Sequence, residues 1–208
     1  IRVKKEYMDI HEEDLAKIND LAEELNKEGM HVIGVAAKKK SVGDTTVFHA
    51  EDETNMTFLG IIAFLDPPKP DAKEAIRGLY DAGVHVKVIS GDAPVVVEHV
   101  CKLVGMKVGD QSAVTGSDLE NMSDTELSSV VEKNDIFARL SPMQKKRVVD
   151  ALRNNGHVVG YMGDGVNDAP SLHDADVGIS VDNGTDVAKA SADIILLEKS
   201  LTVILNGI

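Results

Sequence analysis

The chain of 208 residues is long enough for one ordinary domain, or for one domain and part of a second. Its hydrophobic share of 43% and its charged share of 27% are typical of a globular protein and argue against a disordered or fibrous one. The formal net charge of −13 argues against a nucleic-acid-binding surface, which needs clustered Lys and Arg, and the single cysteine, Cys101, excludes an internal disulfide bond.

The first third of the chain predicts a helix followed by two strands. Apolar residues recur at helical spacing over residues 9–28, and Gly29 follows as a stop signal. Residues 31–37 predict a buried strand, and residues 56–66 predict a second strand after a polar connection. Three prolines in "LDPPKP" then stiffen the chain, and the character of the sequence changes at this joint.

From residue 70 onward, short apolar runs alternate with amphipathic segments. The pattern predicts helices over residues 70–83, 93–105 and 141–156, and strands over residues 84–90, 135–140, 157–163, 177–180 and 192–197. A polar interlude, which includes residues 115–134, separates the second helix from the second strand. Nearly continuous apolar strands separated by amphipathic helices indicate an α/β fold with a doubly wound parallel sheet covered on both faces.

Polar residues follow the predicted strands, at the sheet edge where open parallel sheets bind ligands. Ser90, Gly91 and Asp92 come directly after one strand and lead into a helix, an arrangement that holds phosphoryl oxygens on backbone donors. Lys145 lies near the start of a later helix, where its ammonium group can neutralise a phosphoryl group.

A glycine-rich turn follows the strand predicted over residues 157–163. Two glycines flank Asp164, and Asn167 and Asp168 come behind it in "GDGVNDAP". Carboxylate and carbonyl oxygens are the ligands that Mg²⁺ prefers, usually with phosphate and water completing the shell. A hydroxyl, a lysine and a metal-binding aspartate on successive strand ends predict a phosphoryl-transfer site, although the pattern includes no nucleophile.

Each feature taken alone has a simpler structural interpretation. "SGD" is more often a strand-to-helix turn with a cap, and an isolated lysine is most often solvated. "GDGVNDAP" could be a glycine turn, and it lacks the Asp-x-Asp-x-Asp-Gly spacing and the distal Glu of a calcium loop. Because all three occur in this order on one alternating framework, the sequence favours a common site.

Four motifs of the chain, "LDPPK", "SGD", "FARLSPMQK" and "GDGVNDAPSL", resemble the phosphorylation domain of P-type cation-transporting ATPases, which are members of the haloacid dehalogenase superfamily. The resemblance runs from about Thr57 to the C-terminus, so residues 57–208 would be a haloacid dehalogenase-like, Rossmann-like phosphorylation domain. Residues 1–56 resemble the C-terminal part of the nucleotide-binding domain. "IAFLDPP" and "ADIILLEKSLTVI" are most similar to the bacterial magnesium-transporting subgroup.

The resemblance implies Mg²⁺ and ATP as cofactors and assigns roles to residues at the motif positions. Lys145 would pair with an aspartyl phosphate, with Lys146 as the neighbouring alternative. The other roles are Mg²⁺ binding by Asp164 and Asp168, support of the metal shell and phosphate by Asn167 and Asp168, contacts to phosphoryl oxygens by Ser90 and Gly91, and nucleotide positioning by Asp66 and Asp92.

The chain departs from the family pattern in one respect. Family members carry the phosphorylated aspartate in an Asp-Lys-Thr-Gly-Thr segment on the central strand, and no such segment occurs in these 208 residues. We therefore expect the chain to be an excerpt of a longer parent, inactive alone because both its nucleophile and its central strand are missing. The parent would supply this segment and transmembrane helices, and the chain would lie at the cytoplasmic face of the cell membrane.

Three functional hypotheses remain open at this point. The first is an ATP-driven pump for magnesium, with a pump for calcium or another cation as its alternative. The second is a soluble haloacid dehalogenase-type phosphatase, against which "FARLSP" and "LDPPK" argue. The third is a Mg²⁺-binding module without a nucleophile.

Overall fold

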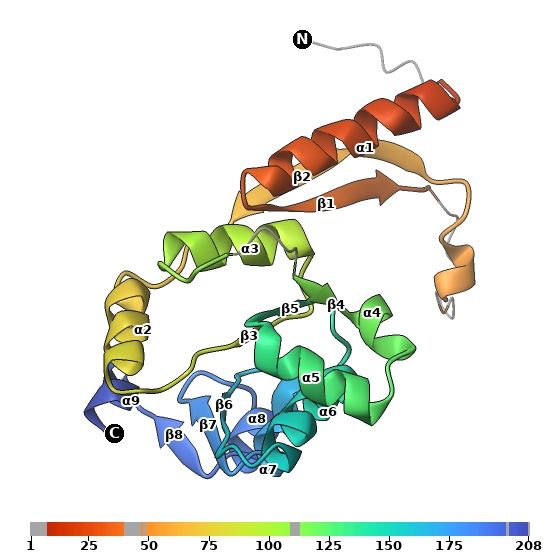
Figure 1. Cartoon of the computed structure of the whole chain (residues 1–208). Coiled ribbons are helices and arrows are strands. Elements are labelled where there is room, and N and C mark those ends of the chain that lie inside the picture. The colour runs from red at the N-terminus through yellow and green to blue at the C-terminus, as the bar shows by residue number, and fades with distance from the viewer. Residues whose placement is uncertain (1–7, 40–46, 48, 109–112, 199, 208) are drawn as a thin grey trace. The chain divides into compact units, whose positions relative to one another are not determined.

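The computed structural model describes residues 8–39, 47, 49–108, 113–198 and 200–207, which fall into two compact units, residues 1–66 and 67–208. The chain is shown in Figure 1. The division lies after Asp66 and not after residue 56, because the strand that ends at Leu65 is paired along its length with a strand of the first unit.

The first unit consists of a helix and a two-stranded antiparallel sheet. Helix α1 (Glu12–Lys27) ends before Gly29, whose φ of 84° suits glycine at a helix end. Strand β1 (Met30–Ala37) pairs with β2 (Thr57–Leu65), and a short 3₁₀ helix, η1 (Ala50–Asp52), lies in the connection between them. The helix and the two strands predicted from the sequence are present, but the prediction that the first strand is mostly buried is wrong, because every residue of β1 is at least partly exposed.

The second unit is a mixed α/β structure in which all strand pairing within the described residues is parallel. Six strands form two three-stranded sheets, with the orders β3-β5-β4 and β6-β7-β8. The strands are β3 (Val88–Ile89), β4 (Val114–Thr115), β5 (Ile136–Ala138), β6 (Gly160–Met162), β7 (Val177–Val181) and β8 (Ile194–Leu196). The predicted parallel α/β fold is confirmed.

Helices connect these strands along the chain (Figure 1). They are α2 (Ala72–Asp81), α3 (Pro94–Leu103), α4 (Gly116–Glu120), α5 (Asp124–Lys133), α6 (Pro142–Asn154), the 3₁₀ turn η2 (Val166–Asp168), α7 (Ala169–Asp174), α8 (Asp186–Ala190) and α9 (Thr202–Asn206). The polar interlude of the sequence contains β4, α4 and α5, which were not predicted as elements.

Strand β5 shows how the two faces of its sheet are covered. Ile136 and Ala138 point to a core cluster with residues of α2 and α3, whereas Phe137, between them, points to a cluster with residues of α5 and α6. This alternation follows from the two-residue period of a strand and buries both faces of β5. The second unit is therefore doubly wound around β5.

Strand β3 is an edge of the first sheet and β6 is an edge of the second, and these two strands do not pair with each other within the described residues. A cavity of about 570 Å³ is lined by Val88 of β3, by Met162 of β6, and by Cys101 and Val104 of α3 and its end. Cys101 is fully buried, and burial raises the pKa of its thiol to about 11.

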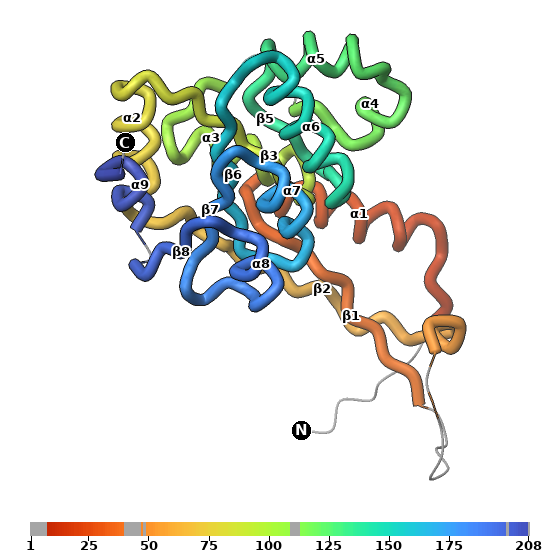
Figure 2. The backbone as a smooth tube through the Cα atoms, turned by 90° about the horizontal axis from the view of Figure 1, so that it is seen from below, coloured from red at the N-terminus to blue at the C-terminus, as the bar shows by residue number. Residues whose placement is uncertain are grey.

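Helix α9 packs against α2, and the two lie side by side in Figure 2. A Cβ atom at Gly78 of α2 would lie 2.3 Å from Leu205 Cδ2, so glycine permits this close approach. An oxygen of the Asp71 carboxylate accepts hydrogen bonds from the Ser200 hydroxyl at 2.6 Å and from the Leu201 N–H at 2.8 Å.

In the part of the chain that the structure describes, no helix is both long and apolar enough to cross a membrane.

Candidate functional site

The loop after β3 is held by hydrogen bonds to the end of β5. Ser90 N–H donates to the Phe137 carbonyl at 2.9 Å, and its own carbonyl accepts from Leu140 N–H at 3.0 Å. The Ser90 hydroxyl donates to Asp92 Oδ2 at 2.8 Å and accepts from Asp92 N–H at 3.0 Å. In this structure, therefore, the Ser90 hydroxyl is bonded within its own turn, which leads through Gly91 into α3.

The residues after β5 connect this loop to the helix that carries Lys145. Arg139 has a φ of 53° and donates its N–H to the Asp92 carbonyl at 2.9 Å. Helix α6 begins directly afterwards, where the Ser141 hydroxyl accepts from Gln144 N–H and the Gln144 side chain accepts from Ser141 N–H at 2.9 Å. This capping box fixes the first turn of α6, which contains Lys145.

The turn after β6 depends on two glycines. A Cβ atom at Gly163 would lie 2.5 Å from the Cβ atom of Asp168, so any larger residue there would displace the Asp168 side chain. Gly165 N–H donates to Asp168 Oδ2 at 3.2 Å. The Asp168 carboxylate therefore folds back over the turn and braces it, while Asp164 lies at its exposed tip.

A largely enclosed ion pair joins α6 to this turn. Lys145 Nζ lies 2.8 Å from Asp168 Oδ1, and the two side chains expose only 12% and 14% of their surfaces. Oδ1 also accepts a hydrogen bond from the hydroxyl of Tyr161 on β6 at 2.9 Å. With the Gly165 N–H on the other oxygen, the carboxylate has three donors.

These contacts affect the pKa values of Asp168 and Tyr161. Burial alone would raise the pKa of Asp168, but the hydrogen bond and charge of Lys145, together with the Tyr161 hydroxyl and Gly165 N–H, hold it below its usual value. Burial, and then the negative charge of Asp168, raise the pKa of Tyr161 far above its usual value. At neutral pH the site therefore contains a carboxylate that accepts and a phenol that donates.

Lys146, the neighbouring candidate, binds elsewhere. Its ammonium group lies 2.7 Å from Asp150 Oδ2 and 2.5 Å from Asp174 Oδ2, carboxylates that belong to α6 and α7. Of the two adjacent lysines, only Lys145 reaches the turn after β6 within the described contacts.

Asp164 is the carboxylate left available for a cation. Its side chain is exposed, and no hydrogen bond joins it to any residue that the structure describes. Asn167 is likewise exposed on η2. Since Mg²⁺ commonly takes only one or two protein carboxylates with phosphate and water, these residues fit a magnesium site that is completed by substrate. Among the described residues there is no group of three or more His, Cys, Asp or Glu that could hold a metal by itself.

A loop that the sequence analysis did not single out supports Asp164. Thr185 N–H donates to the Asp164 carbonyl at 2.8 Å, and a Cβ atom at Gly184 would lie 3.3 Å from the same oxygen. Asn183 lines the cavity together with Asp164. This loop follows β7, so the rule that selects loops after parallel strands would have found it.

The predicted site residues thus fall into three groups. Asp164, Asp168 and Lys145 are linked through one turn, whereas Ser90, Gly91 and Asp92 form the neighbouring loop after β3, joined to α6 through residues 139–141. Asp66 belongs to the first unit and comes directly after β2.

The chain matches the family model described as haloacid dehalogenase-like hydrolase over residues 6–176. It is 51% identical to the magnesium-transporting ATPase, P-type 1, of Salmonella typhimurium over 187 residues, which are 89% of this chain and 20% of that protein. The protein of the same name from Escherichia coli K12 is 45% identical over 93% of this chain and 21% of its own length. The calcium-transporting ATPase 1 of Saccharomyces cerevisiae is 40% identical over 93% of this chain and 20% of its own length.

A solved structure of the catalytic domain of the CPx-ATPase CopB-B, studied for its conformational changes upon nucleotide binding, has the same fold. It matches 73% of this chain and 48% of that chain with a TM-score of 0.52 and 28% sequence identity. The resemblance to P-type ATPases predicted from the motifs is confirmed. The chain spans about a fifth of the length of the curated relatives that it matches.

Proposed function

Because the chain belongs to the haloacid dehalogenase-like hydrolases and is homologous to the catalytic region of magnesium-transporting P-type ATPases, we propose that it is the catalytic part of an ATP-driven cation pump. The parent works through an aspartyl phosphate and lies with this region at the cytoplasmic face of the cell membrane. The observation that carries the proposal is the enclosed Lys145–Asp168 pair beside the exposed Asp164 carboxylate, at the ends of parallel strands.

Each side chain of the site has a part in phosphoryl transfer under this proposal. Asp164 holds Mg²⁺, with Asn167 close by, and the bound ion supplies positive charge to the phosphoryl oxygens. Lys145 stabilises the negative charge of the transferred group, and Asp168 holds its ammonium group within the site before that group arrives. The loop of Ser90 and Gly91 offers a hydroxyl and a backbone N–H for phosphoryl oxygens once the Ser90–Asp92 bond opens.

The nucleophile comes from outside these 208 residues, since the sequence contains no Asp-Lys-Thr-Gly-Thr segment. A covalent aspartyl phosphate divides hydrolysis into two steps, and the phosphorylated state can then carry a conformational change. Among the described residues, β3 and β6 each pair along one edge only, and a largely apolar cavity lies near them; both features favour completion by an extended apolar segment of the parent. Asp66 and Asp92 position the nucleotide.

Magnesium is the transported ion that the comparisons favour. The two magnesium-transporting relatives are 51% and 45% identical to the chain, compared with 40% for the yeast calcium-transporting ATPase. Ion selectivity depends on membrane segments that these residues do not contain, so calcium is the runner-up. The test is ATP-driven uptake by vesicles that contain the full-length parent: uptake of Mg²⁺ supports the proposal, and uptake of Ca²⁺ alone favours the runner-up.

A phosphatase of the same superfamily is the rival enzyme. Such an enzyme would hydrolyse a small phosphate monoester without a membrane part. We expect the 208-residue chain to release no phosphate from p-nitrophenyl phosphate in the presence of Mg²⁺, because it lacks the nucleophile. Turnover that disappears in Asp164→Asn would instead establish the phosphatase and contradict the pump proposal.

A further inference from the structure

Tyr161 lies under the candidate site, although the sequence pattern marks it only as part of a strand. It occupies the middle of β6, exposes 7% of its surface and belongs to the core cluster with Val149, Leu172 and Ala188. Its hydroxyl is directed at Asp168 Oδ1, at a distance of 2.9 Å. A buried tyrosine whose ring is held by packing has a hydroxyl with little freedom to move.

The same oxygen is shared with Lys145. Lys145 Nζ lies 2.8 Å from Oδ1, while Oδ2 accepts from Gly165 N–H and so braces the turn that presents Asp164. The two donors on Oδ1 differ in mobility, since a lysine side chain has a long flexible stem and a tyrosine side chain has only two rotatable bonds.

An incoming phosphoryl group changes the balance between these donors. Its negative charge competes with Asp168 for the ammonium group of Lys145. If Lys145 turned away without a replacement, a largely enclosed carboxylate would lose its charged partner, which is costly. The Tyr161 hydroxyl stays on Oδ1, because the core holds its ring in place.

We propose that Tyr161 is a positioning residue that holds Asp168, and through it the turn carrying Asp164, while Lys145 moves to the phosphoryl group. This inference rests on the proposed function, because it requires a phosphoryl group at the site. Tyr161 touches neither the substrate nor the metal in this role. Its effect reaches the cation only through Asp168 and the Gly165 N–H.

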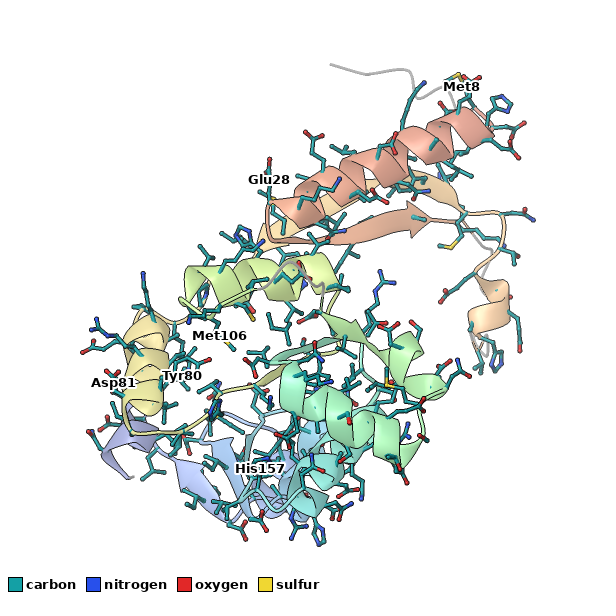
Figure 3. The ribbon with its side chains drawn as sticks, in the orientation of Figure 1. Met8, Glu28, Tyr80, Asp81, Met106 and His157 are labelled. Carbon is teal, nitrogen blue, oxygen red and sulfur yellow. The ribbon has the colours of Figure 1, made fainter. Side chains whose placement is uncertain are left out.

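The test compares Tyr161→Phe with Tyr80→Phe in the full-length parent. Both changes remove one hydroxyl, but Tyr80 is 38% exposed on α2 (Figure 3) and lies outside the site. The measured quantities are the Mg²⁺ concentration for half-maximal phosphoenzyme formation and the ATP concentration for half-maximal formation at saturating Mg²⁺. Thermal unfolding of each variant is recorded in parallel.

We expect Tyr161→Phe to raise the half-maximal Mg²⁺ concentration about tenfold, the effect of losing one hydrogen bond to a charged group. The half-maximal ATP concentration should stay unchanged, and Tyr80→Phe should behave as the wild type. The inference is overturned if Tyr161→Phe has the Mg²⁺ dependence of Tyr80→Phe. It is also overturned if the Mg²⁺ and ATP requirements rise together with a lower unfolding temperature, since this indicates a general packing role. A wild-type parent that forms no phosphoenzyme overturns the proposed function, and this inference with it.

Discussion

Lys145→Met and Lys146→Met remove adjacent ammonium groups from one helix, and we expect them to have different effects on stability. Lys145 pairs with Asp168, with side chains that are 12% and 14% exposed. Lys146 pairs with Asp150 and Asp174, where the exposed fractions are 30% for the lysine and 37% and 25% for the two carboxylates. Water screens the second set of charges more than the first.

The difference can be estimated from the contacts that remain. Breaking a buried ion pair by removing one partner costs about 3–5 kcal/mol. In Lys145→Met, Asp168 keeps two of its three donors, the Tyr161 hydroxyl and the Gly165 N–H, so we expect a loss of about 2 kcal/mol in the free energy of unfolding. More exposed pairs contribute about 0–1 kcal/mol, which is the loss expected for Lys146→Met.

Urea unfolding of the 208-residue chain, followed by far-ultraviolet circular dichroism, measures both losses. The first unit contains neither lysine, so its part of the signal is an internal reference. Equal losses in the two variants, or a larger loss in Lys146→Met, would refute the argument that Lys145 and Asp168 form an enclosed pair.

Three further predictions concern other parts of the second unit. Gly163→Ala places a Cβ atom 2.5 Å from that of Asp168, and we expect it to lower the free energy of unfolding by about 1–3 kcal/mol; an unchanged urea midpoint would contradict this. The Ser200 hydroxyl and then backbone N–H groups lower the pKa of Asp71, so the stabilisation is present above the carboxyl's unfolded pKa and is lost as pH falls through the lowered value. The protection of α9 amides from exchange, relative to the intrinsic exchange rate at each pH, should therefore fall in acid, and less steeply in Ser200→Ala; protection in α9 that does not change with pH would contradict this. Because burial raises the pKa of Cys101 to about 11, the thiol should resist a disulfide reagent at neutral pH until urea unfolds the chain, and rapid reaction in the native state would be inconsistent with its burial.

The strongly periodic parts of the sequence predicted the fold well. Apolar runs predicted the strands β5 and β7, and helical spacing predicted the helix α6. All three are present in the structure, so tertiary packing did not override these local patterns. The strand in the polar interlude was harder to predict, because β4 consists only of Val114–Thr115 and is too short to show an alternating pattern. Helices α4 and α5 nevertheless begin with Thr-x-x-Asp and Ser-x-x-Glu capping boxes, a signal that the sequence did contain.

The candidate site could be predicted only in part, because sequence spacing gives no direction for a side chain. The sequence marked both Lys145 and Lys146 as candidates. In the structure Lys145 pairs with Asp168 and Lys146 pairs with Asp150, and this difference depends on the rotation of α6 against the turn after β6. The sequence marked Asp168 as a metal ligand, but a carboxylate that already accepts from three donors is better suited to support. Tyr161 was not marked, because a tyrosine in an apolar strand has the pattern of a core residue.

The most direct test of the proposed function is to incubate the full-length parent with Mg²⁺ and ATP labelled on its γ-phosphate, quench in acid, and measure the label on the protein. We expect a stable label that hydroxylamine removes, as an acyl phosphate requires, and that is strongly reduced in Asp164→Asn. Full-length protein that hydrolyses ATP without acquiring such a label, or that keeps it undiminished in Asp164→Asn, would contradict the aspartyl-phosphate pump proposed for this chain.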